Sequence, residues 1–182
     1  MIDKTELKNW VNSNTFVVVD IETTGLNFSQ DEIIDLSAIK LKDGQIIDKF
    51  TSLCKPQNPI TKEIEQLTQI TNKMVENSPS SSQVVKAFLQ FADNAILVSY
   101  NINFDYNFIK ECAKQQNIDI DYKTFDCLYY IKQLFPKLNN YRFYTALKAL
   151  GIKGKIDNST ISSATTTSEM FLNLIDILYK KC

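Results

Sequence analysis

Acidic side chains in two short segments have the spacing needed to hold a metal ion. Asp20 and Glu22 begin a DIETTGL segment that directly follows an apolar run, and Asp105 closes a later SYNINFD segment. Side chains alternate along a strand, so Asp20 and Glu22 point to the same face. Carboxylates this close repel each other unless a cation joins them, which favours a site for a hard divalent ion. A solvated acidic pair at a strand end is the competing interpretation of so short a pattern.

Any chemistry in this chain must rest on carboxylates, because the sequence contains no histidine. That absence removes the usual base at neutral pH and the commonest metal ligand. Cys54, Cys112, Cys127 and Cys182 are far apart and form no C-x-x-C pair, so we expect reduced thiols in the core rather than a zinc site. The formal net charge is −1, so an acidic polymer could bind only at a local basic patch.

The length and composition predict one globular domain over residues 1–182. The chain is 44% hydrophobic and 23% charged, a balance typical of a folded domain with a real core. Residues 1–14 lack the apolar centre of a signal peptide, and no apolar stretch is long enough to span a bilayer. We therefore expect a cytoplasmic protein that does not associate with membranes.

Hydrophobic periodicity and turn residues predict an α/β domain with a mixed sheet. The β-branched run at 16–19 is typical of a central strand, and Asp43-Gly44 is typical of a hairpin turn. Strands come first along the chain and alternate with helices later, which places a site at the carboxyl ends of the strands. The expected strands are 16–19 ending at Asp20, 32–41, 45–54, 95–99 and 123–126. The expected helical segments are 3–13, 61–75, 83–92, 103–116, 127–134, 141–150 and 161–180.

The two acidic segments resemble the first two motifs of the DEDD superfamily of 3′-to-5′ exonucleases. DIETTGL is similar to the first motif, and the N-x-x-F-D of residues 101–105 is similar to the second. The order of the expected elements is similar to that of the superfamily's histidine branch. That branch comprises the DnaQ-like proofreading exonucleases, the family of the DNA polymerase III epsilon subunit. The LTQITNKMV segment resembles the family's I-H-G-I-T-x-x-M-V, and the segments FDCL, LFP and NYRF match the elements before its last motif. The resemblance implies a ribonuclease-H-like exonuclease fold, a mixed five-stranded sheet with helices on both faces.

The resemblance also implies a ligand set and a substrate. In the family, carboxylates at the positions of Asp20, Glu22 and Asp105 hold divalent ions, Mg²⁺ or Mn²⁺, against the scissile phosphate. The substrate would be the 3′ end of single-stranded DNA or RNA. The side chains at the border of the terminal nucleotide would be those of Thr23, Leu26, Asn101 and Phe104.

The third family motif, H-x-A-x-x-D, is degenerate in this chain. Asn158 stands at the histidine position and Ser163 at the last aspartate. Asparagine cannot accept the proton of an attacking water, and a serine hydroxyl is a poor substitute for a carboxylate ligand. Loss of a general base alone costs on the order of 10²–10⁴ in rate. We therefore expect hydrolysis to be weak or lost, and the ion to be held weakly or at a single site.

Three other groups are candidates to replace the lost ones. Asp157 neighbours Asn158, although a helix cap is its simpler role. Glu169 lies six residues beyond Ser163, roughly 9 Å along a helix and on another face, so it is too far. Tyr122 and Asp126 have the Y-x-x-x-D spacing of the superfamily's tyrosine branch, but they precede the helix that normally comes before the third motif.

A basic, aromatic segment leads up to the degenerate motif. Between Cys127 and Ile156 the sequence has no acidic residue, and its cations and rings are what a single-stranded phosphate track would need. Solvated lysines on helices whose rings belong to the core are the equally favoured alternative. The cations are Lys132, Lys137, Arg142, Lys148, Lys153 and Lys155; the rings are Tyr129, Tyr130, Phe135, Tyr141, Phe143 and Tyr144.

Three functions therefore remain open from the sequence. The first is a DnaQ-like protein that binds single-stranded 3′ ends and hydrolyses them poorly. The second is a non-catalytic binding module attached to a DNA polymerase or a repair complex. The third is a protein-interaction scaffold with no role in nucleic-acid binding. Nuclease activity with Mn²⁺, salt-sensitive oligonucleotide binding and a large exposed apolar patch are the observations that separate them.

Overall fold

The computed structural model describes residues 3–153 and 159–181 of the chain. Five strands alternate with helices in the order expected from the sequence. The strands are β1 (Thr15–Thr23), β2 (Ile33–Lys42), β3 (Gln45–Leu53), β4 (Ile96–Ser99) and β5 (Thr124–Asp126). The helices are α1 (Lys4–Ser13), α2 (Lys62–Thr68), α3 (Asn72–Val75), α4 (Ser81–Ala92), α5 (Ile102–Lys114), α6 (Cys127–Leu134), α7 (Phe143–Ala149) and α8 (Thr160–Lys181).

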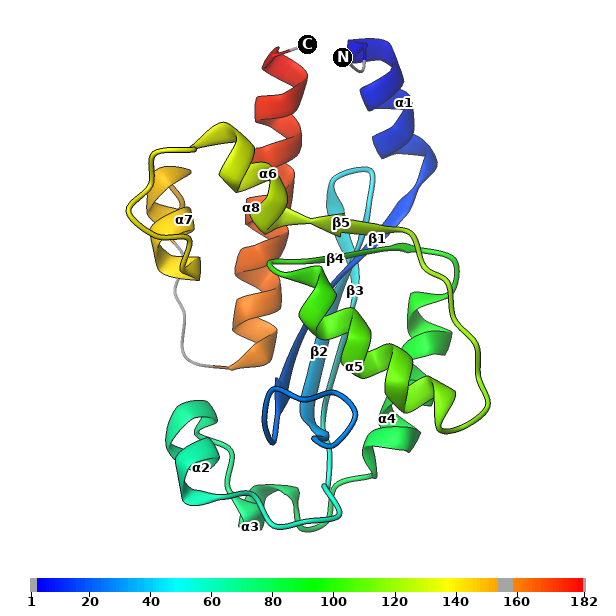
Figure 1. Cartoon of the computed structure of the whole chain (residues 1–182). Helices are drawn as coiled ribbons and strands as arrows, with labels where there is room; N and C mark the ends of the chain where they lie inside the picture. Colours follow the sequence, from blue (N-terminus) through cyan, green and yellow to red (C-terminus); the bar gives the residue numbers. More distant parts are fainter. Residues whose placement is uncertain (1–2, 154–158, 182) are drawn as a thin grey trace.

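The strands form one mixed sheet in the order β3-β2-β1-β4-β5 (Figure 1). β1, β2 and β3 form an antiparallel meander, and β4 and β5 continue the sheet as parallel strands on the other side of β1. The predicted mixed five-stranded sheet is therefore confirmed. β1 lies at its centre, as its continuous apolar run indicated.

Helices cover both faces of this sheet, and each face has its own core. Val17 and Val19 of β1 pack with α4 and α5, while Phe16 and Val18 pack with α6, α7 and α8. This division follows from the alternation of side chains along a strand. Each fully buried side chain of this size contributes about 1.5–3 kcal/mol to folding, so the two cores hold the sheet rigidly between its helices.

β1 is longer than the sequence predicted, and the expected end at Asp20 is wrong. The strand runs to Thr23 because β2 continues to pair with it, with Glu22 opposite Asp35 and Thr23 opposite Ile33. The two acidic residues therefore lie inside a paired strand and not beyond its end. A register shift between Glu22 and Thr23 then releases the chain into the loop that follows.

Other boundaries differ from the prediction for local reasons. The helical segment expected at 61–75 is divided into α2 and α3, because Gln69 adopts a left-handed conformation with φ of 62°. That conformation closes α2, and Thr71 then caps α3 through its side chain. α7 is shorter than the expected 141–150 and begins after Arg142.

The described cysteines and helices agree with two further expectations from the sequence. Cys54, Cys112 and Cys127 are buried free thiols; Cys182 lies outside the described residues. None of the described helices is both long enough and apolar enough to cross a membrane.

Candidate metal and nucleic-acid site

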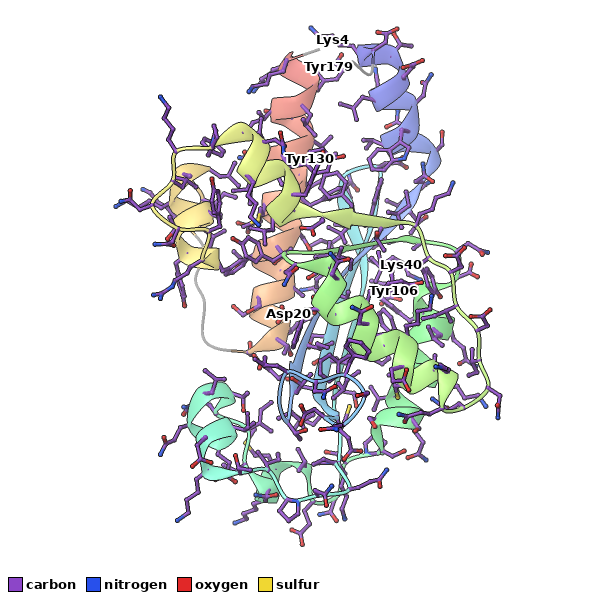
Figure 2. The ribbon with its side chains drawn as sticks, in the orientation of Figure 1. Lys4, Asp20, Lys40, Tyr106, Tyr130 and Tyr179 are labelled. Carbon is purple, nitrogen blue, oxygen red and sulfur yellow. The ribbon has the colours of Figure 1, made fainter. Side chains whose placement is uncertain are left out.

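Asp20 and Glu22 belong to a polar patch on the α8-facing side of the sheet. Their direct partners on β2 are Ser37, opposite Asp20, and Asp35, opposite Glu22. Side chains directly opposite each other in an antiparallel pair share one face and lie close together. Figure 2 labels Asp20 on β1, beside the first turns of α8. Four polar side chains thus meet on a face that is otherwise apolar.

Asp105 reaches the same region from α5, on the other side of the sheet. β4 ends at Ser99 while β1 continues, so the C-terminal part of β1 has no neighbouring strand on that side. There the Ile21 backbone N–H donates to Asp105 Oδ1 at 3.2 Å, and Ser99 Oγ donates to Asp105 Oδ2 at 2.6 Å. Asp105 is buried, at 4% exposure. The structure therefore brings the three predicted carboxylates to one edge of the sheet.

Burial and mutual repulsion raise the pKa values of all three carboxyl groups. Burial, followed by the charges of Asp105, Glu22 and Asp35, raises the pKa of Asp20 well above its usual value. Burial first and Asp35 second raise the pKa of Glu22 to about 7. Burial raises the pKa of Asp105 to about 7, against the lowering effect of its hydrogen bond from Ser99. Negative charge is therefore concentrated here without compensation.

No described cation neutralises this charge. Within residues 3–153 and 159–181, the ion pairs are Lys114 with Glu111 and Lys180 with Asp176, neither of which involves the site. A hard divalent cation is the partner that such a set of carboxylate oxygens fits best. The site also contains an orphaned atom, because Asp35 Oδ1 is buried and has no hydrogen-bond partner among the described residues.

The carboxylates are not gathered into a finished metal cage. Among the described residues, no group of three or more acidic, thiol or imidazole side chains lies close enough together to hold a metal ion. Metal binding by Asp20, Glu22 and Asp105 therefore stays a prediction that the donor set supports.

α8 closes the other side of the site with hydroxyl groups. Thr160, in its first turn, is buried and donates to Asp35 Oδ2 at 2.7 Å. It also lies 2.7 Å from Ser37 Oγ, which in turn lies 2.8 Å from Thr51 Oγ1. A hydroxyl has one proton to donate, so Ser37 must donate to Thr160 and Thr51 to Ser37. This chain of hydroxyls fastens the start of α8 to β2 and β3.

The degenerate third motif lies where these hydroxyls are. Ser163 is half-buried, one turn after Thr160, and brings no charge to the site. Asn158 and Asp157 lie outside the described residues. The proposed replacement of a carboxylate by Asp157 is therefore still a prediction.

The other suggested replacements have different positions in the structure. Glu169 is exposed on α8, as its helical spacing from Ser163 predicted. Tyr122 Oη donates to the Leu89 carbonyl, and Asp126 caps α6 by accepting from the Tyr129 N–H. Both groups of the tyrosine-branch alternative thus serve the scaffold, and that alternative is wrong.

The residues predicted to border the terminal nucleotide differ in exposure. Leu26 is 86% exposed, and Asn101 is exposed at the start of α5. Thr23 is buried and its Oγ1 donates to the Gly25 carbonyl, while the Phe104 ring packs 5.1 Å from that of Phe108. Leu26 and Asn101 are therefore free to meet a ligand, and Thr23 and Phe104 shape the surface beneath it. Contact with a nucleotide stays a prediction for all four.

The loop after β1 is closed tightly by Asp31. Its carboxylate accepts from the Asn27 N–H at 2.8 Å and from Thr24 Oγ1 at 3.3 Å. A β-carbon at Gly25 would collide with this carboxylate, so the glycine of the motif is needed for close approach. The loop is thereby fixed next to Glu22.

The basic segment retains its cations on the surface but fewer free rings than expected. Lys132, Lys137, Arg142, Lys148 and Lys153 are exposed, and Lys155 lies outside the described residues. Of the rings, Tyr129 and Tyr144 are 57% and 62% exposed. Tyr130, Phe135, Tyr141 and Phe143 pack against the core, as the alternative interpretation held. Binding of nucleic acid by Lys132, Lys137 and Arg142 stays a prediction.

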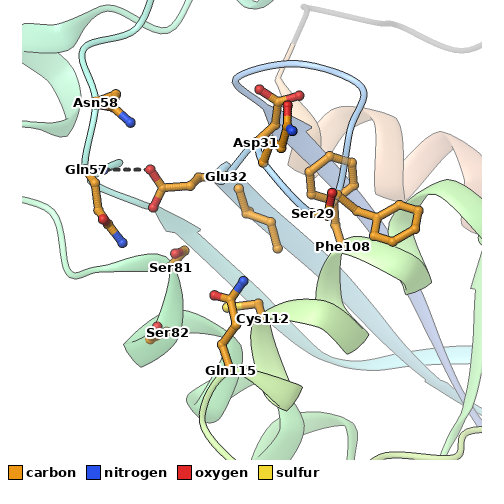
Figure 3. A pocket seen from close by; sticks show the side chains of 13 residues that line it. Ser29, Asp31, Glu32, Gln57, Asn58, Ser81, Ser82, Phe108, Cys112 and Gln115 are labelled. Carbon is orange, nitrogen blue, oxygen red and sulfur yellow. Dashed lines mark hydrogen bonds between the residues drawn. The ribbon is translucent and has the colours of Figure 1, made fainter.

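A separate small cavity lies on the α4 and α5 side of the molecule (Figure 3). Its volume is about 160 Å³, and Gln57 N–H donates to Glu32 Oε2 at its wall at 2.7 Å. Its lining comes from the loop before β2, the start of α4 and one side of α5, and includes none of Asp20, Glu22, Asp35 and Asp105. We assign it no role in the site.

The sequence analysis missed Asp35, Ser37 and Thr160. A signal was present, since Asp35 and Ser37 interrupt the otherwise apolar IIDLSAIKL run of a strand buried on both faces. Polar residues at inward positions of such a strand need partners, and those partners are Thr160 for Asp35, and Thr51 and Thr160 for Ser37.

A family model described as an exonuclease matches residues 17–156. The match includes Asp20, Glu22 and Asp105 and ends before Asn158 and Ser163.

Several curated relatives are DNA polymerases III of the PolC type. The chain is 37% identical over 163 residues to a DNA polymerase III PolC-type of Caldanaerobacter subterraneus subsp. tengcongensis, covering 90% of the chain. It is 36% identical over 167 residues to that of Thermotoga petrophila, covering 91% of the chain. The match covers only 12% of the length of each of these relatives.

Solved structures of exonuclease I share the fold. One exonuclease I structure superposes with a TM-score of 0.79 at 18% identity, covering 92% of this chain and 43% of that one. The E. coli exonuclease I complex with a dT13 oligonucleotide gives a TM-score of 0.75 at 17% identity, covering 87% and 40%. These superpositions confirm the ribonuclease-H-like exonuclease fold.

Proposed function

Because the chain belongs to the DnaQ-like DEDD family of 3′-to-5′ exonucleases, we propose that it binds single-stranded 3′ ends through a divalent cation and hydrolyses them weakly. The ligands are Asp20, Glu22 and Asp105. The observation that carries this proposal is a set of mutually repelling carboxylates, with Asp105 buried and Asp20 and Glu22 half-buried, to which no described cation is paired. Their charge is costly without a partner, and a divalent ion with a bound phosphate supplies one.

The cation would be Mg²⁺ or Mn²⁺, since both prefer carboxylate oxygen. When bound, it would offset the negative charge of the terminal phosphate beside these acids. The zinc-bound structure of E. coli exonuclease I with single-stranded DNA is an example of a metal in this fold. The protein itself orients the ligands, through the hydrogen bonds of Ile21 and Ser99 to Asp105.

The substrate is the 3′ end of single-stranded DNA or RNA. Exposed Leu26 and Asn101 lie on the loops next to the carboxylates, where a terminal base and sugar would be held. Exposed Lys132, Lys137 and Arg142 would follow the phosphates of the preceding nucleotides. E. coli exonuclease I structures with dT13 and dA16 oligonucleotides support this substrate class.

Hydrolysis is slow in this proposal because of two residues. Asn158 cannot act as a base near neutral pH, and Ser163 adds no negative charge to the cation site. The two losses disable one catalytic unit, so they do not simply add. We expect binding of single-stranded 3′ ends to be much better preserved than their hydrolysis.

The deciding experiment is incubation of the purified chain with a 3′-labelled single-stranded oligonucleotide and Mn²⁺, with gel analysis of shortening. Asp20→Ala is the control for contaminating nuclease. Slow shortening above that control, together with Mn²⁺-dependent binding, supports the proposal. Oligonucleotide binding that is absent, or identical with and without Mn²⁺ and in Asp20→Ala, would refute it.

A second candidate is a non-catalytic module of a polymerase or repair complex. The PolC-type relatives favour it, because each of them carries the matching region within a much longer polymerase. The same assay separates the two candidates. Mn²⁺-dependent binding with no shortening above the Asp20→Ala control would favour the module.

A further inference from the structure

A fourth carboxylate, that of Asp35, lies beside the three that the family motifs predict. Asp35 is directly opposite Glu22 in the β1–β2 pairing and shares its face of the sheet. Ser37, two residues further along β2, is opposite Asp20, so the same short segment of β2 pairs with both acids of β1.

The two oxygens of Asp35 have different surroundings. Oδ2 accepts the hydrogen bond of Thr160, which fixes the orientation of the carboxylate. Oδ1 is buried and has no hydrogen-bond partner within the described residues. An unsatisfied buried carboxylate oxygen destabilises the fold, so its presence needs an explanation. A cation between Asp35 and its acidic neighbours provides one.

The neighbouring helix shows what such a ligand would replace. At the third motif the family has an aspartate where this chain has Ser163, one turn along α8 from Thr160. Thr160 itself stands at the family's alanine position, and its hydroxyl is the group that holds Asp35. The helix has thus lost a carboxylate and gained a hydroxyl that positions another one, on β2.

From this arrangement we infer that Asp35 is a cation ligand of the site and supplies the carboxylate that Ser163 does not. The inference rests on the proposed function, because it assumes a divalent ion at Asp20, Glu22 and Asp105. It assigns a role to a residue outside the family motifs. Thr160 acts as a positioning residue, through its hydrogen bond to Asp35.

Mn²⁺ binding to the full chain tests the inference without any nuclease readout. We expect titration calorimetry to show that Asp35→Asn weakens Mn²⁺ binding tenfold or more, as loss of ligand-shell groups commonly does. Asp176→Asn, which removes an exposed carboxylate from α8, is the matched control and should leave the affinity unchanged. Unchanged affinity in Asp35→Asn would overturn the inference.

A rescue variant separates a ligand from a merely structural residue. If Asp35 replaces the missing aspartate, Ser163→Asp should restore Mn²⁺ binding in the Asp35→Asn background. Thr160→Val removes the hydrogen bond but keeps the carboxylate, so it should weaken binding less than Asp35→Asn. Equal losses in the two variants, without rescue by Ser163→Asp, would show that Asp35 serves only to fasten α8.

Two further outcomes keep the conclusions distinct. If the wild type binds no Mn²⁺, or if Asp20→Asn binds it as well as the wild type, the proposed function itself fails. If Asp20→Asn loses binding and Asp35→Asn keeps it, only the inference fails. Should Asp35→Asn not fold, Ser163→Asp in the wild-type chain decides: a gain in Mn²⁺ affinity of about threefold or more overturns the inference, and a smaller gain supports it.

Discussion

The two sides of the carboxylate site differ in how they use polar groups. The side built by β1 and α5 holds three acids, of which Asp105 is buried, and its hydrogen bonds from Ile21 and Ser99 go directly to Asp105. On the other side, α8 contributes no charge, and a chain of hydroxyls runs from Thr51 through Ser37 and Thr160 to the Asp35 carboxylate. The first side is costly to fold and useful only with a cation. The hydroxyls of the second side stabilise the packing of α8, and Ser163 stands where the family has a charged aspartate.

Restoring the family residues on the α8 side should have the largest effect. We expect Asn158→His combined with Ser163→Asp to raise Mn²⁺-dependent shortening of a 3′-labelled oligonucleotide by about 10²–10⁴, the usual worth of a general base. Adding Asp20→Ala to this double variant should abolish the gain. A double variant that folds and is no faster than wild type would show that the acidic side is also defective.

The pH dependence of stability should distinguish the acidic side from the neutral one. Glu22 and Asp105 have folded-state pKa values of about 7, against ordinary values of 4.5 and 3.8. Between these values the folded state binds more protons than the unfolded state, so stability falls as pH rises. Between pH 4.5 and 8 in EDTA, we expect the free energy of unfolding of the wild type to fall by a few kcal/mol more than that of Asp20→Asn. This difference corresponds to a shift on the order of 5 °C in Tm.

Saturating Mn²⁺ should remove most of this difference at pH 8, because the cation offsets the repulsion. Thermal unfolding of both proteins across the pH range provides the measurement, with Asp176→Asn as a control for an exposed carboxylate. Parallel curves for wild type and Asp20→Asn would mean that the buried acids are not repelling one another.

Charge reversal around α6 and α7 should weaken binding more modestly. Changing Lys132, Lys137 and Arg142 to glutamate should lower single-stranded oligonucleotide affinity about tenfold and reduce the salt slope by about 2, since each phosphate contact contributes roughly 0.7. Filter binding at several salt concentrations measures both. Changing Lys8, Lys49 and Lys86, which are exposed on α1, β3 and α4, is the matched control. Equal losses in the two triple variants would point to a general charge effect.

Removing the hydroxyl that fastens α8 should have the smallest effect. Thr160→Val loses the hydrogen bonds to Asp35 and Ser37, and we expect it to lower the free energy of unfolding by about 1–2 kcal/mol in a denaturant titration. Thr165→Val is a fair comparison, because the Thr165 hydroxyl bonds only to its own helix at the Ile161 carbonyl. Equal changes in both variants would show that the hydroxyl chain adds no stability.

These two sides also differ in how far the sequence could predict them. Alternation along β1 placed Asp20 and Glu22 on one face, and the strand-to-helix junction placed Asp105 nearby. Both predictions depend on local geometry, which a short segment determines. Asp35 was missed because its importance comes from cross-strand pairing with Glu22, a contact that no local pattern contains.

Strand lengths and helix breaks were also limited by long-range contacts. The end of β1 is set by how far β2 pairs with it, so Asp20 offered no local sign that the strand continues. The break at Gln69 required a left-handed residue that is not a glycine, which sequence propensity disfavours. The basic segment shows the same limit, since only packing decided which rings are buried.

The order of the elements has a consequence for synthesis. Phe16, Val18 and Ile39 belong to the first strands made, yet their face of the sheet is covered mainly by α8, the last described helix. A nascent chain that has emerged only through α7 therefore exposes a broad apolar surface, which is the kind of intermediate that chaperones bind. Closure of the second core and assembly of the cation site would then occur in one late step, after α8 leaves the ribosome.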